Sequence, residues 1–261
     1  NCQVPPLKLK IPEALRRGTP LEPYETLKMV TFCRQGGGGY ETYYRQEYLI
    51  YRMYQLLSPY SLAVRAVRLK VHGPGNGAVR EGLGFVVEPL EALALRTGLR
   101  TVDASQFNLM FCDMQMSTTV AVFQFAMGNT DWSIRSRHNI EMLFEPRTKR
   151  YMPIPYDFDY SGIINAHYAR VEEALGIKSV RDRLFRGHCQ SMDCLGPVIS
   201  AFLEKKNELE AVILQDGFLS EGKKTSMLRY LGDFYRILDN PSRVRQYFIQ
   251  NNRGRAFPRP Q

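Results

Sequence analysis

Residues 1–90 alternate hydrophobic and polar positions in the manner of β-strands, with one helical stretch among them. Strand patterns with a period near two or β-rich composition occupy residues 6–11, 27–33, 62–71 and 83–88. Residues 40–57 instead repeat tyrosine and aliphatic positions at helical spacing, directly after the glycine run at 36–39. The glycine-rich stretch 73–77 is typical of a hairpin connection. This part of the chain therefore predicts a small β-rich unit with one helix.

From residue 88 onward the pattern becomes mainly helical. Residues 88–98 predict a short helix, and Asp103 is a candidate N-cap for a longer apolar helix over residues 107–128. Two further amphipathic helices are predicted over residues 197–215 and 225–238. The first part of the chain is thus predicted to be strands with one helix, and the second part mainly helices. This order predicts an α+β protein of two lobes. We place the N-lobe at residues 1–90, the C-lobe at residues 91–261 and a hinge near residues 88–93.

The charge of the chain narrows the choice of partners only slightly. The 261 residues carry a net charge of +9, which favours anionic partners but also fits a solvated basic surface. The segment 243–261 has five arginines and no acid, so we expect a basic, partly disordered tail. Binding of nucleic acid through this tail is a minor alternative, which predicts steep salt dependence. No apolar run is long enough for a membrane span.

Five cysteines leave the redox state and the compartment open. Cys2 and Cys33 flank strands of one lobe, and Cys189 and Cys194 lie close enough in sequence to pair through a short loop. Both disulfides require an oxidising compartment, and reduced thiols are an equal alternative. The chain starts Asn1-Cys2 rather than with Met, so export after removal of a leading segment is expected as readily as a cytoplasmic location. The spacing of the cysteines does not fit a zinc site.

The richest chemistry lies between residues 129 and 162, in GNTDWSIRSRHN and PIPYDFDYSG. Asp131 precedes Asn139 by eight residues, and Asp157 and Asp159 follow. Residues 140–144 and 152–156 predict a β-hairpin that carries Asn139 before its first strand and Asp157 after its second. Asp131 is a candidate catalytic base, and Asn139 and Asp157 are candidate metal ligands, with Asp159 as a second carboxylate ligand or a substrate-side group. Each residue alone would more often cap a turn, so the hypothesis depends on their order.

The alternation of an extended chain points Asp157 and Asp159 to opposite faces, so only one is expected to bind metal directly unless a bend turns both inward. In the N-lobe, Lys28 precedes the helix that carries Glu47. Lys28 could reach the nucleotide phosphates, and the Glu47 carboxylate could hold the Lys28 ammonium in place as an ion pair. Lys8 and Lys10 are alternative candidates for the role of Lys28, and Glu41 is an alternative candidate for the role of Glu47. At the hinge, Glu88 would offer backbone groups to an adenine ring.

These motifs resemble the catalytic segment of the CotH-type protein kinases of bacterial spore coats, and more distantly HipA-type and lipid kinases. The resemblance covers residues 5–190 and is specific only between Asn129 and Asp159. It implies an atypical protein-kinase-like fold, ATP and a divalent metal, with Asp131 as base and Asn139 and Asp157 as metal ligands. The spacing from Asp131 to Asn139 is about three residues longer than in the HRDxxxxN pattern of protein kinases. The extra residues either bulge away harmlessly or displace Asn139.

The sequence thus predicts an ATP-dependent kinase that uses Mg²⁺ or Mn²⁺ to phosphorylate a hydroxyl of a protein, small molecule or sugar. Transfer of AMP instead of a phosphoryl group is compatible with the same metal site. Two alternatives stay open: an inactive pseudokinase or structural binding module, and a metal-dependent phosphohydrolase that uses Asp157 and Asp159 without ATP. The sequence does not identify the acceptor or the oligomeric state.

Overall fold

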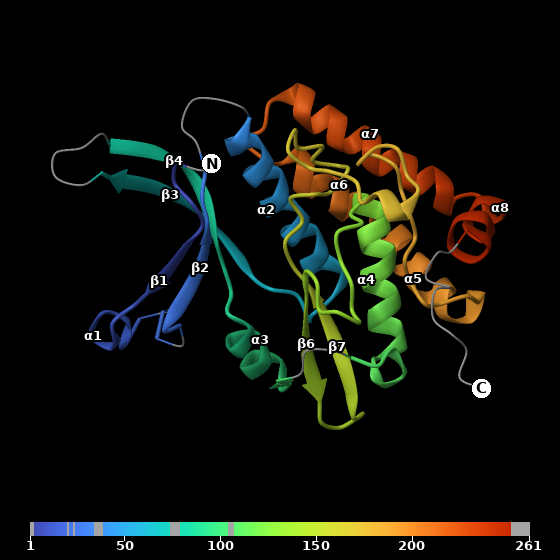
Figure 1. Cartoon of the computed structure of the whole chain (residues 1–261), viewed down its shortest axis with the longest axis horizontal. Coiled ribbons are helices and arrows are strands. Elements are labelled where there is room, and N and C mark those ends of the chain that lie inside the picture. Colours follow the sequence, from blue (N-terminus) through green and yellow to red (C-terminus); the bar gives the residue numbers. More distant parts are fainter. Residues whose placement is uncertain are drawn as a thin grey trace.

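The computed structural model describes residues 3–19, 21–22, 24–33, 39–73, 79–103 and 107–251. It confirms the α+β class, with a small antiparallel sheet on one side and a larger, mainly helical part on the other (Figure 1). In the described part of the chain, no helix has both the length and the apolar character needed to cross a bilayer.

The N-terminal sheet has four strands in the order β1-β2-β4-β3. Its elements are β1 (Leu7–Lys10), a short helix α1 (Glu13–Arg16), β2 (Thr26–Val30), β3 (Val64–His72) and β4 (Val79–Val87). Neighbouring strands are antiparallel, and Lys28 on β2 is opposite Lys8 on one side and Val87 on the other. This register places Lys28 beside the end of β4, where the chain crosses to the helical part.

Helix α2 (Tyr40–Leu57) joins the sheet to the larger part. It begins after Gly39, whose backbone is left-handed with φ 74°, a conformation that glycine adopts without strain. Tyr48 and Tyr51 pack on Phe85 of β4, and Tyr54 packs on Phe123 in the helical part. The helix therefore contributes to one hydrophobic cluster that continues from the sheet into the helices.

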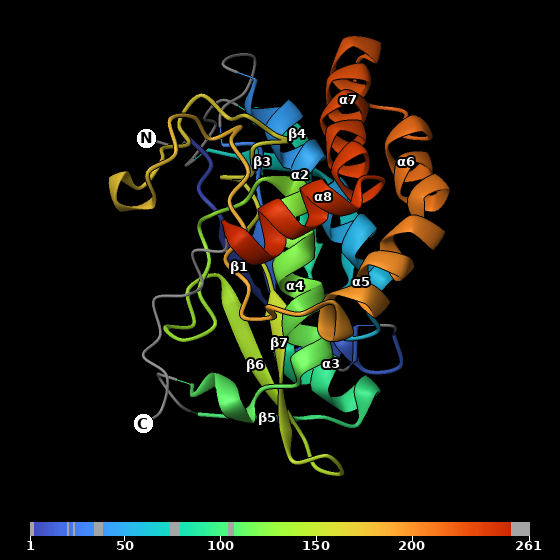
Figure 2. The ribbon, with the colours of Figure 1, turned by 90° about the vertical axis from the view of Figure 1, so that its right-hand side faces the viewer.

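The larger part packs around one buried helix, with a hairpin beside it (Figure 2). Its elements are α3 (Leu90–Thr97), β5 (Arg100–Thr101), η1 (Leu109–Phe111), α4 (Met114–Met127), β6 (Ile140–Glu145), β7 (Arg150–Pro155), η2 (Glu173–Leu175), α5 (Met192–Glu204), α6 (Lys206–Leu214), α7 (Glu221–Leu238), α8 (Pro241–Val244) and η3 (Arg245–Gln250). Helix α4 is buried on all sides from Ser117 to Met127, as an almost wholly apolar helix requires. Strands β5, β6 and β7 form a second antiparallel sheet.

The long helix predicted over residues 107–128 is shorter than expected. Helix α4 begins only at Met114, because Asp113 is its N-cap and accepts the backbone N–H of Met116 at 2.8 Å. The preceding residues form the 3₁₀ turn η1, and the backbone N–H of Asp113 donates to the carbonyl of Tyr151 on β7. The prediction that Asp103 caps this helix was wrong, since the contact with β7 fixes the start ten residues later.

The single helix predicted over residues 197–215 was also wrong. The chain forms two helices that meet at Lys205, whose φ of −89° and ψ of 3° leave the helical region. Pro197 lies inside α5 rather than at its start. The break lets both helices bury a face, with Phe202 of α5 and Leu209 of α6 in the core.

Part of the expected basic tail is folded. Residues 241–250 form α8 and the π-helix η3, and Phe248 of η3 is fully buried against Phe125 and Phe185. Residues 252–261 lie outside the described part of the chain.

One of the two predicted disulfides is present. Cys189 and Cys194 are bonded, with their Cα atoms 6.0 Å apart. The pairing of Cys2 with Cys33 stays a prediction, because Cys2 lies outside the described residues.

Candidate active site

The β6–β7 hairpin brings Asn139 and Asp157 to the same end of one sheet. Ile140 pairs with Pro155, and the backbone N–H of Tyr156 donates to the carbonyl of Asn139 at 3.1 Å. Asn139 and Asp157 both have left-handed backbones, with φ of 51° and 60°. The chain therefore bends sharply on entering and on leaving the hairpin, and both side chains come from these bends.

Asp131 lies beside Asn139 despite the longer spacing between them. The Asn139 amide nitrogen donates to the Asp131 carbonyl at 2.8 Å and to its Oδ2 at 3.0 Å. The extra residues form a closed turn, because Ser133 and His138 exchange two backbone hydrogen bonds of 2.8 and 3.0 Å. His138 Nε2 also lies 2.7 Å from Asp131 Oδ1. The insertion thus bulges outward and returns the chain to Asp131.

Asp157 and Asp159 approach one another instead of pointing to opposite faces. The bend at Asp157 breaks the extended alternation on which that expectation depended, and Phe158 between them is fully buried. The pKa of Asp159 is raised to about 7, first because the carboxyl is largely buried and then because the Asp157 carboxyl lies beside it. Asp131 contributes to the same shift, so these carboxyls share one electrostatic environment.

Lys28 and Glu47 face the same carboxyls from the sheet and from α2. A cavity of about 340 Å³ is lined by Lys28, Glu47, Asp157 and Asp159, together with Tyr44 and Tyr168. Glu47 is only 3% exposed, and its Oε1 accepts the backbone N–H of Phe158 at 3.3 Å. Burial, followed by the charges of Asp157 and Asp159, raises the pKa of Glu47 well above its usual value.

The expected ion pair between Lys28 and Glu47 is not formed among the described side chains. Lys28 Nζ instead lies 5.3 Å from the centre of the Tyr156 ring. Of the alternative candidates for its role, Lys10 pairs with Glu25 on the sheet surface at 3.6 Å, whereas Lys8 lines the larger cleft described next.

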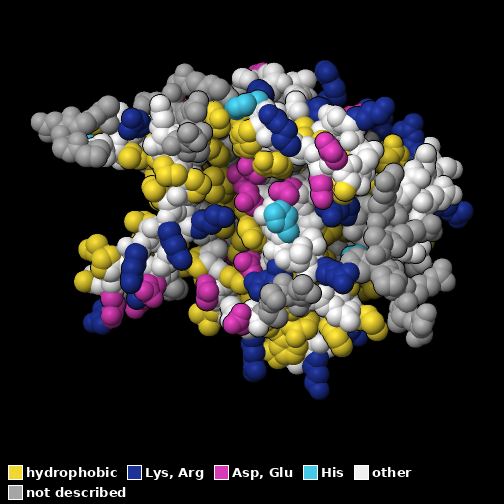
Figure 3. Space-filling model, in the orientation of Figure 1, with side chains coloured by type: hydrophobic (Ala, Val, Ile, Leu, Met, Phe, Trp, Pro, Cys, Tyr) yellow, Lys and Arg dark blue, Asp and Glu magenta, His cyan; other side chains and the backbone are white. Residues whose placement is uncertain are grey.

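A larger cleft of about 790 Å³ continues from Lys28 toward the connection between the two parts. Its lining includes Lys8, Lys28, Tyr51, residues 87–92, Glu141 and Tyr156. Lys28 and Tyr51 also line the smaller cavity, so the two spaces are adjacent at these residues. Hydrophobic and charged side chains meet in this region, between the sheet and the helical part (Figure 3).

Glu88 anchors this connection through its side chain. Its carboxylate accepts Arg96 Nε at 2.7 Å and the backbone N–H of Ala63 at 2.9 Å. Its own N–H donates to the carbonyl of Ala63 at 2.8 Å. The N–H of Glu88 is therefore already used, and an adenine ring at this position would meet its carbonyl or other backbone groups of the connection.

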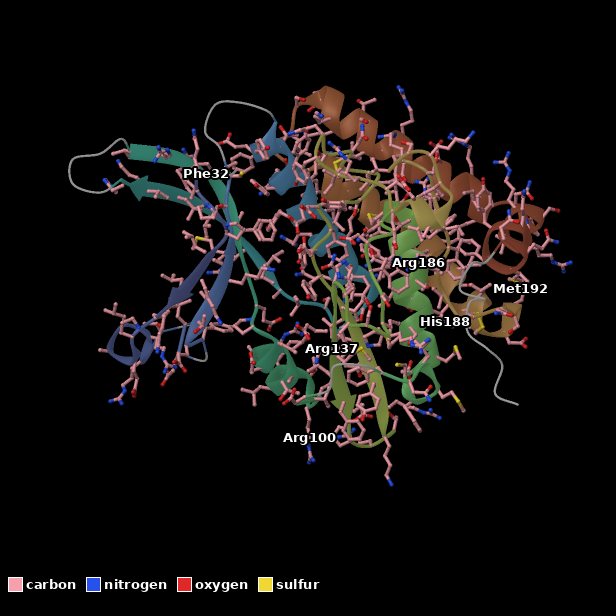
Figure 4. All side chains as sticks on the ribbon, in the orientation of Figure 1. Phe32, Arg100, Arg137, Arg186, His188 and Met192 are labelled. Atoms are coloured by element: carbon pink, nitrogen blue, oxygen red, sulfur yellow. A yellow bond between two sulfur atoms is a disulfide. The ribbon has the colours of Figure 1, made fainter. Side chains whose placement is uncertain are left out.

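Sequence reasoning missed several residues that border the site. Tyr168 hydrogen-bonds the Asp159 carboxyl and stacks on Tyr40, with ring centres 5.9 Å apart. Arg186 donates to the carbonyl of Thr130, next to Asp131, and burial lowers its pKa (Figure 4). Neither residue lies in a motif, and both reach the site from the irregular segment between β7 and α5. The tyrosines of α2 were visible as a helical face, but their position beside the carboxyls was not.

Comparison with known proteins gives a limited result. No protein-family model matches the chain, and no curated protein sequence matches it. Among solved structures, the crystal structure of a Helicobacter pylori proinflammatory kinase, CtkA, is similar over 85% of this chain and 87% of that chain, with 14% sequence identity and a TM-score of 0.47. At this level, neither an activity nor the role of any residue carries over to this chain.

Proposed function

We propose that this protein is an atypical kinase that uses ATP and Mg²⁺ or Mn²⁺ to phosphorylate a hydroxyl group. The observation that carries the proposal is the convergence of Asp131, Asn139, Asp157 and Asp159 at one end of the β6–β7 hairpin, facing Lys28 and Glu47. Phosphoryl transfer depends on positioning and charge neutralisation, and these residue types supply both. The acceptor is a protein, a small molecule or a sugar.

The donor set fits a hard divalent cation. The amide N–H groups of Asn139 donate to Asp131, so its Oδ1 is the atom that is available to a metal. Asp157 and Asp159 bring two acidic groups together, and a bound cation would relieve their repulsion, which acts together with the larger effect of burial to raise the pKa of Asp159. Among the described residues, no three or more His, Cys, Asp or Glu side chains already surround one metal position. The proposed ligands are therefore two carboxylates and one amide, completed by phosphate oxygens and water.

Each residue then has a definite task. Asp131 would accept the proton of the attacking hydroxyl, with its carboxylate held by His138 and Asn139. Lys28 would approach the phosphates, and residues 87–92 would border the adenine. A metal held by Asn139, Asp157 and Asp159 would neutralise charge on the phosphates when bound. The cleft volume of about 790 Å³ is within the usual range for small-molecule sites.

Thermal unfolding with ATP, with and without Mg²⁺ or Mn²⁺, tests the nucleotide site. A ligand at 100 times its Kd stabilises the fold by about 2.7 kcal/mol, which raises the Tm of a chain of this size by about 5–10 °C. We expect this shift only with metal, and we expect it to be lost in Asp157→Ala but kept in the control Asp239→Ala, which changes an exposed acid at the C-cap of α7. No shift with either metal would remove every ATP-dependent alternative.

Labelled ATP separates the alternatives that share this site. Incorporation of label from γ-labelled but not α-labelled ATP supports a kinase, and the reverse pattern supports AMP transfer. Nucleotide binding without transfer supports a pseudokinase or binding module. Hydrolysis of a simple phosphate ester without ATP, lost in Asp157→Ala, would support the phosphohydrolase.

A further inference from the structure

The tip of the β6–β7 hairpin lies beside the turn η1 at the lower end of the molecule (Figure 1). Arg150 Nη1 donates to the carbonyl of Met110 at 2.7 Å, and Cys112 forms a backbone bridge with Tyr151. These contacts hold η1 and the tip together as one surface. We define the hairpin-tip surface by Met110, Phe111 and Met114 with the cations Arg100, Arg147, Lys149 and Arg150.

Three large apolar side chains of this surface point into solvent. Met110 is 68% exposed, Phe111 is 56% exposed and Met114 is 53% exposed. They are not a frayed end, because Asn108 Oδ1 accepts the N–H of Met110 at 3.0 Å and Asp113 caps α4. The same segment buries Phe107 and Cys112. This segment therefore has some apolar side chains buried and others exposed, and its backbone hydrogen bonds hold the exposed ones in a defined position.

Four cations come from the second sheet, which carries this apolar group at its β7 edge. Arg100 lies at the end of β5, opposite Phe144 of β6, and is drawn at the lower end of the molecule (Figure 4). Arg147, Lys149 and Arg150 come from the hairpin tip, and all are exposed. Lys and Arg side chains project beyond the hydrophobic surface at this end (Figure 3).

Two of the acids in or next to these segments are held by backbone groups. Glu145 accepts the backbone N–H of Arg147 and of Thr148, each at 3.1 Å, and Asp113 caps α4. A third acid, Asp103, is exposed shortly after β5. The four cations still outnumber these carboxylates, and none of the four takes part in an ion pair of the described residues. The surface combines exposed apolar side chains with an excess of positive charge.

We propose that the hairpin-tip surface docks the protein on an anionic lipid surface. Apolar side chains that enter the headgroup region and cations that face anionic lipids are the two contributions of peripheral membrane binding. Neither cavity of the active site includes any of these residues, so the surface is separate from the proposed catalytic site. A protruding tip suits the flat, deformable face of a bilayer better than it suits a peptide, which usually needs a groove.

Vesicle co-sedimentation of the full chain is the test. We expect binding to phosphatidylcholine vesicles that contain about 30% phosphatidylserine, weakened at high salt, and little binding to phosphatidylcholine alone. Each cation near the surface contributes about fivefold in affinity, so Arg147→Glu with Lys149→Glu should lower binding by at least 25-fold, roughly the product of two such factors. Phe111→Ser should lower binding about tenfold or more, because a buried Phe side chain contributes strongly at an interface.

Matched controls separate the tip from general charge and hydrophobicity. Leu15→Ser removes an apolar side chain that is 70% exposed on α1, and Arg229→Glu reverses an exposed cation on α7. Both should bind anionic vesicles like the unchanged chain. Because the substituted tip residues are exposed, circular dichroism should show each variant folded, and Met110→Ser provides a second apolar variant.

Two results would overturn the proposal. One is the absence of binding to anionic vesicles at low salt. The other is binding that the tip variants leave unchanged or that the controls reduce equally. Concentration-dependent dimerisation in sedimentation velocity, lost in Phe111→Ser and without vesicle binding, would assign the surface to a second copy of the chain instead.

Discussion

Asp131 has both carboxylate oxygens engaged, Oδ1 by His138 and Oδ2 by Asn139. These contacts fix the direction of the carboxylate and leave its remaining lone pairs for an incoming hydroxyl. They also explain how an insertion of about three residues, relative to the HRDxxxxN pattern, is compatible with the same set of residues. The turn closed by Ser133 and His138 adds the histidine contact that the shorter spacing would lack.

Substitution of Asp131 distinguishes an enzyme from a binding module. Asp131→Asn keeps the size of the side chain but removes the base, so transfer should fall by about 10²–10⁴. His138→Ala should lower the rate less, because it removes only one of the contacts that hold the carboxylate. Transfer assays with labelled ATP measure the rate, and the ATP-dependent Tm shift shows that binding is retained. Full transfer in Asp131→Asn would assign the base to another residue.

The raised pKa of Asp159 predicts how the stability of the fold depends on pH. Its pKa rises from 3.8 to about 7 on folding, through burial first and Asp157 second, so the folded protein holds a proton that the unfolded chain releases. The contribution of Asp159 to stability is therefore full below about pH 4 and is lost as the pH rises to about 7.

Asp159→Asn mimics the neutral form and removes this dependence. Without divalent metal, the variant should gain stability over the unchanged chain between pH 4 and pH 7, by on the order of 2–4 kcal/mol at pH 8. Urea unfolding at several pH values measures the difference. A gap that does not change with pH would show that Asp159 is ionised in the folded protein throughout.

At the scale of elements, the sequence predicts the boundaries of some helices correctly and those of others incorrectly. Helix α2 begins and ends where its tyrosine and leucine spacing predicts, because its boundaries depend on local features, a glycine before it and an apolar face along it. The start of α4 depends on the strand that contacts Asp113, and Asp103 and Asp113 are equally good N-caps by local criteria. Remote contacts cannot be inferred from local spacing.

The candidate site shows the same limit. The order of Asp131, Asn139 and Asp157 could be read from the sequence, and the hairpin next to the last two could be predicted from it. The approach of Asp157 to Asp159 was not, because it depends on a left-handed Asp backbone, which few non-glycine residues adopt. Arg186 and Tyr168 come from an irregular segment without periodicity, so no pattern placed them.

A buried ion pair holds α2 against the helical part. Arg45 Nε donates to Asp216 Oδ2 at 2.5 Å, and the Asp216 side chain is 0% exposed. Asp216 also accepts the backbone N–H groups of Phe218 and Leu219, in the turn between α6 and α7. The N-terminal half of α2, near Glu47, is thereby tied to the larger part of the molecule.

Loss of one partner of this pair should be costly. Arg45→Ala leaves a buried carboxylate without its cation, and the free energy of unfolding should fall by about 3–5 kcal/mol. Arg45→Met combined with Asp216→Asn should recover part of this loss, since no charge is then buried alone. Arg52→Ala, on an exposed position of the same helix, should cost less than about 1 kcal/mol. Urea unfolding measures all three; a small effect of Arg45→Ala would mean that the apolar face alone holds α2.

At the scale of the whole molecule, α2 makes the two parts share one hydrophobic core. Tyr51 contacts Phe85 of the sheet and Phe158 of the active-site segment, with ring centres 5.7 and 4.9 Å apart. Tyr54 reaches Phe123 of α4 at 4.8 Å. A boundary near residue 90 separates the four-stranded sheet and α2 from the rest of the chain, but the buried cluster continues across it.

This continuity predicts one cooperative unfolding transition instead of two. Trp132, the only tryptophan in the chain, is 3% exposed and reports on the helical part. A chain with Trp132→Phe and Met29→Trp reports on the sheet through β2. Because separating the parts would expose the aromatic contacts of α2, both chains should show fluorescence and circular dichroism transitions that coincide in urea. An earlier transition of the Met29→Trp signal would show that the sheet unfolds by itself and that residues 1–90 form a separate unit.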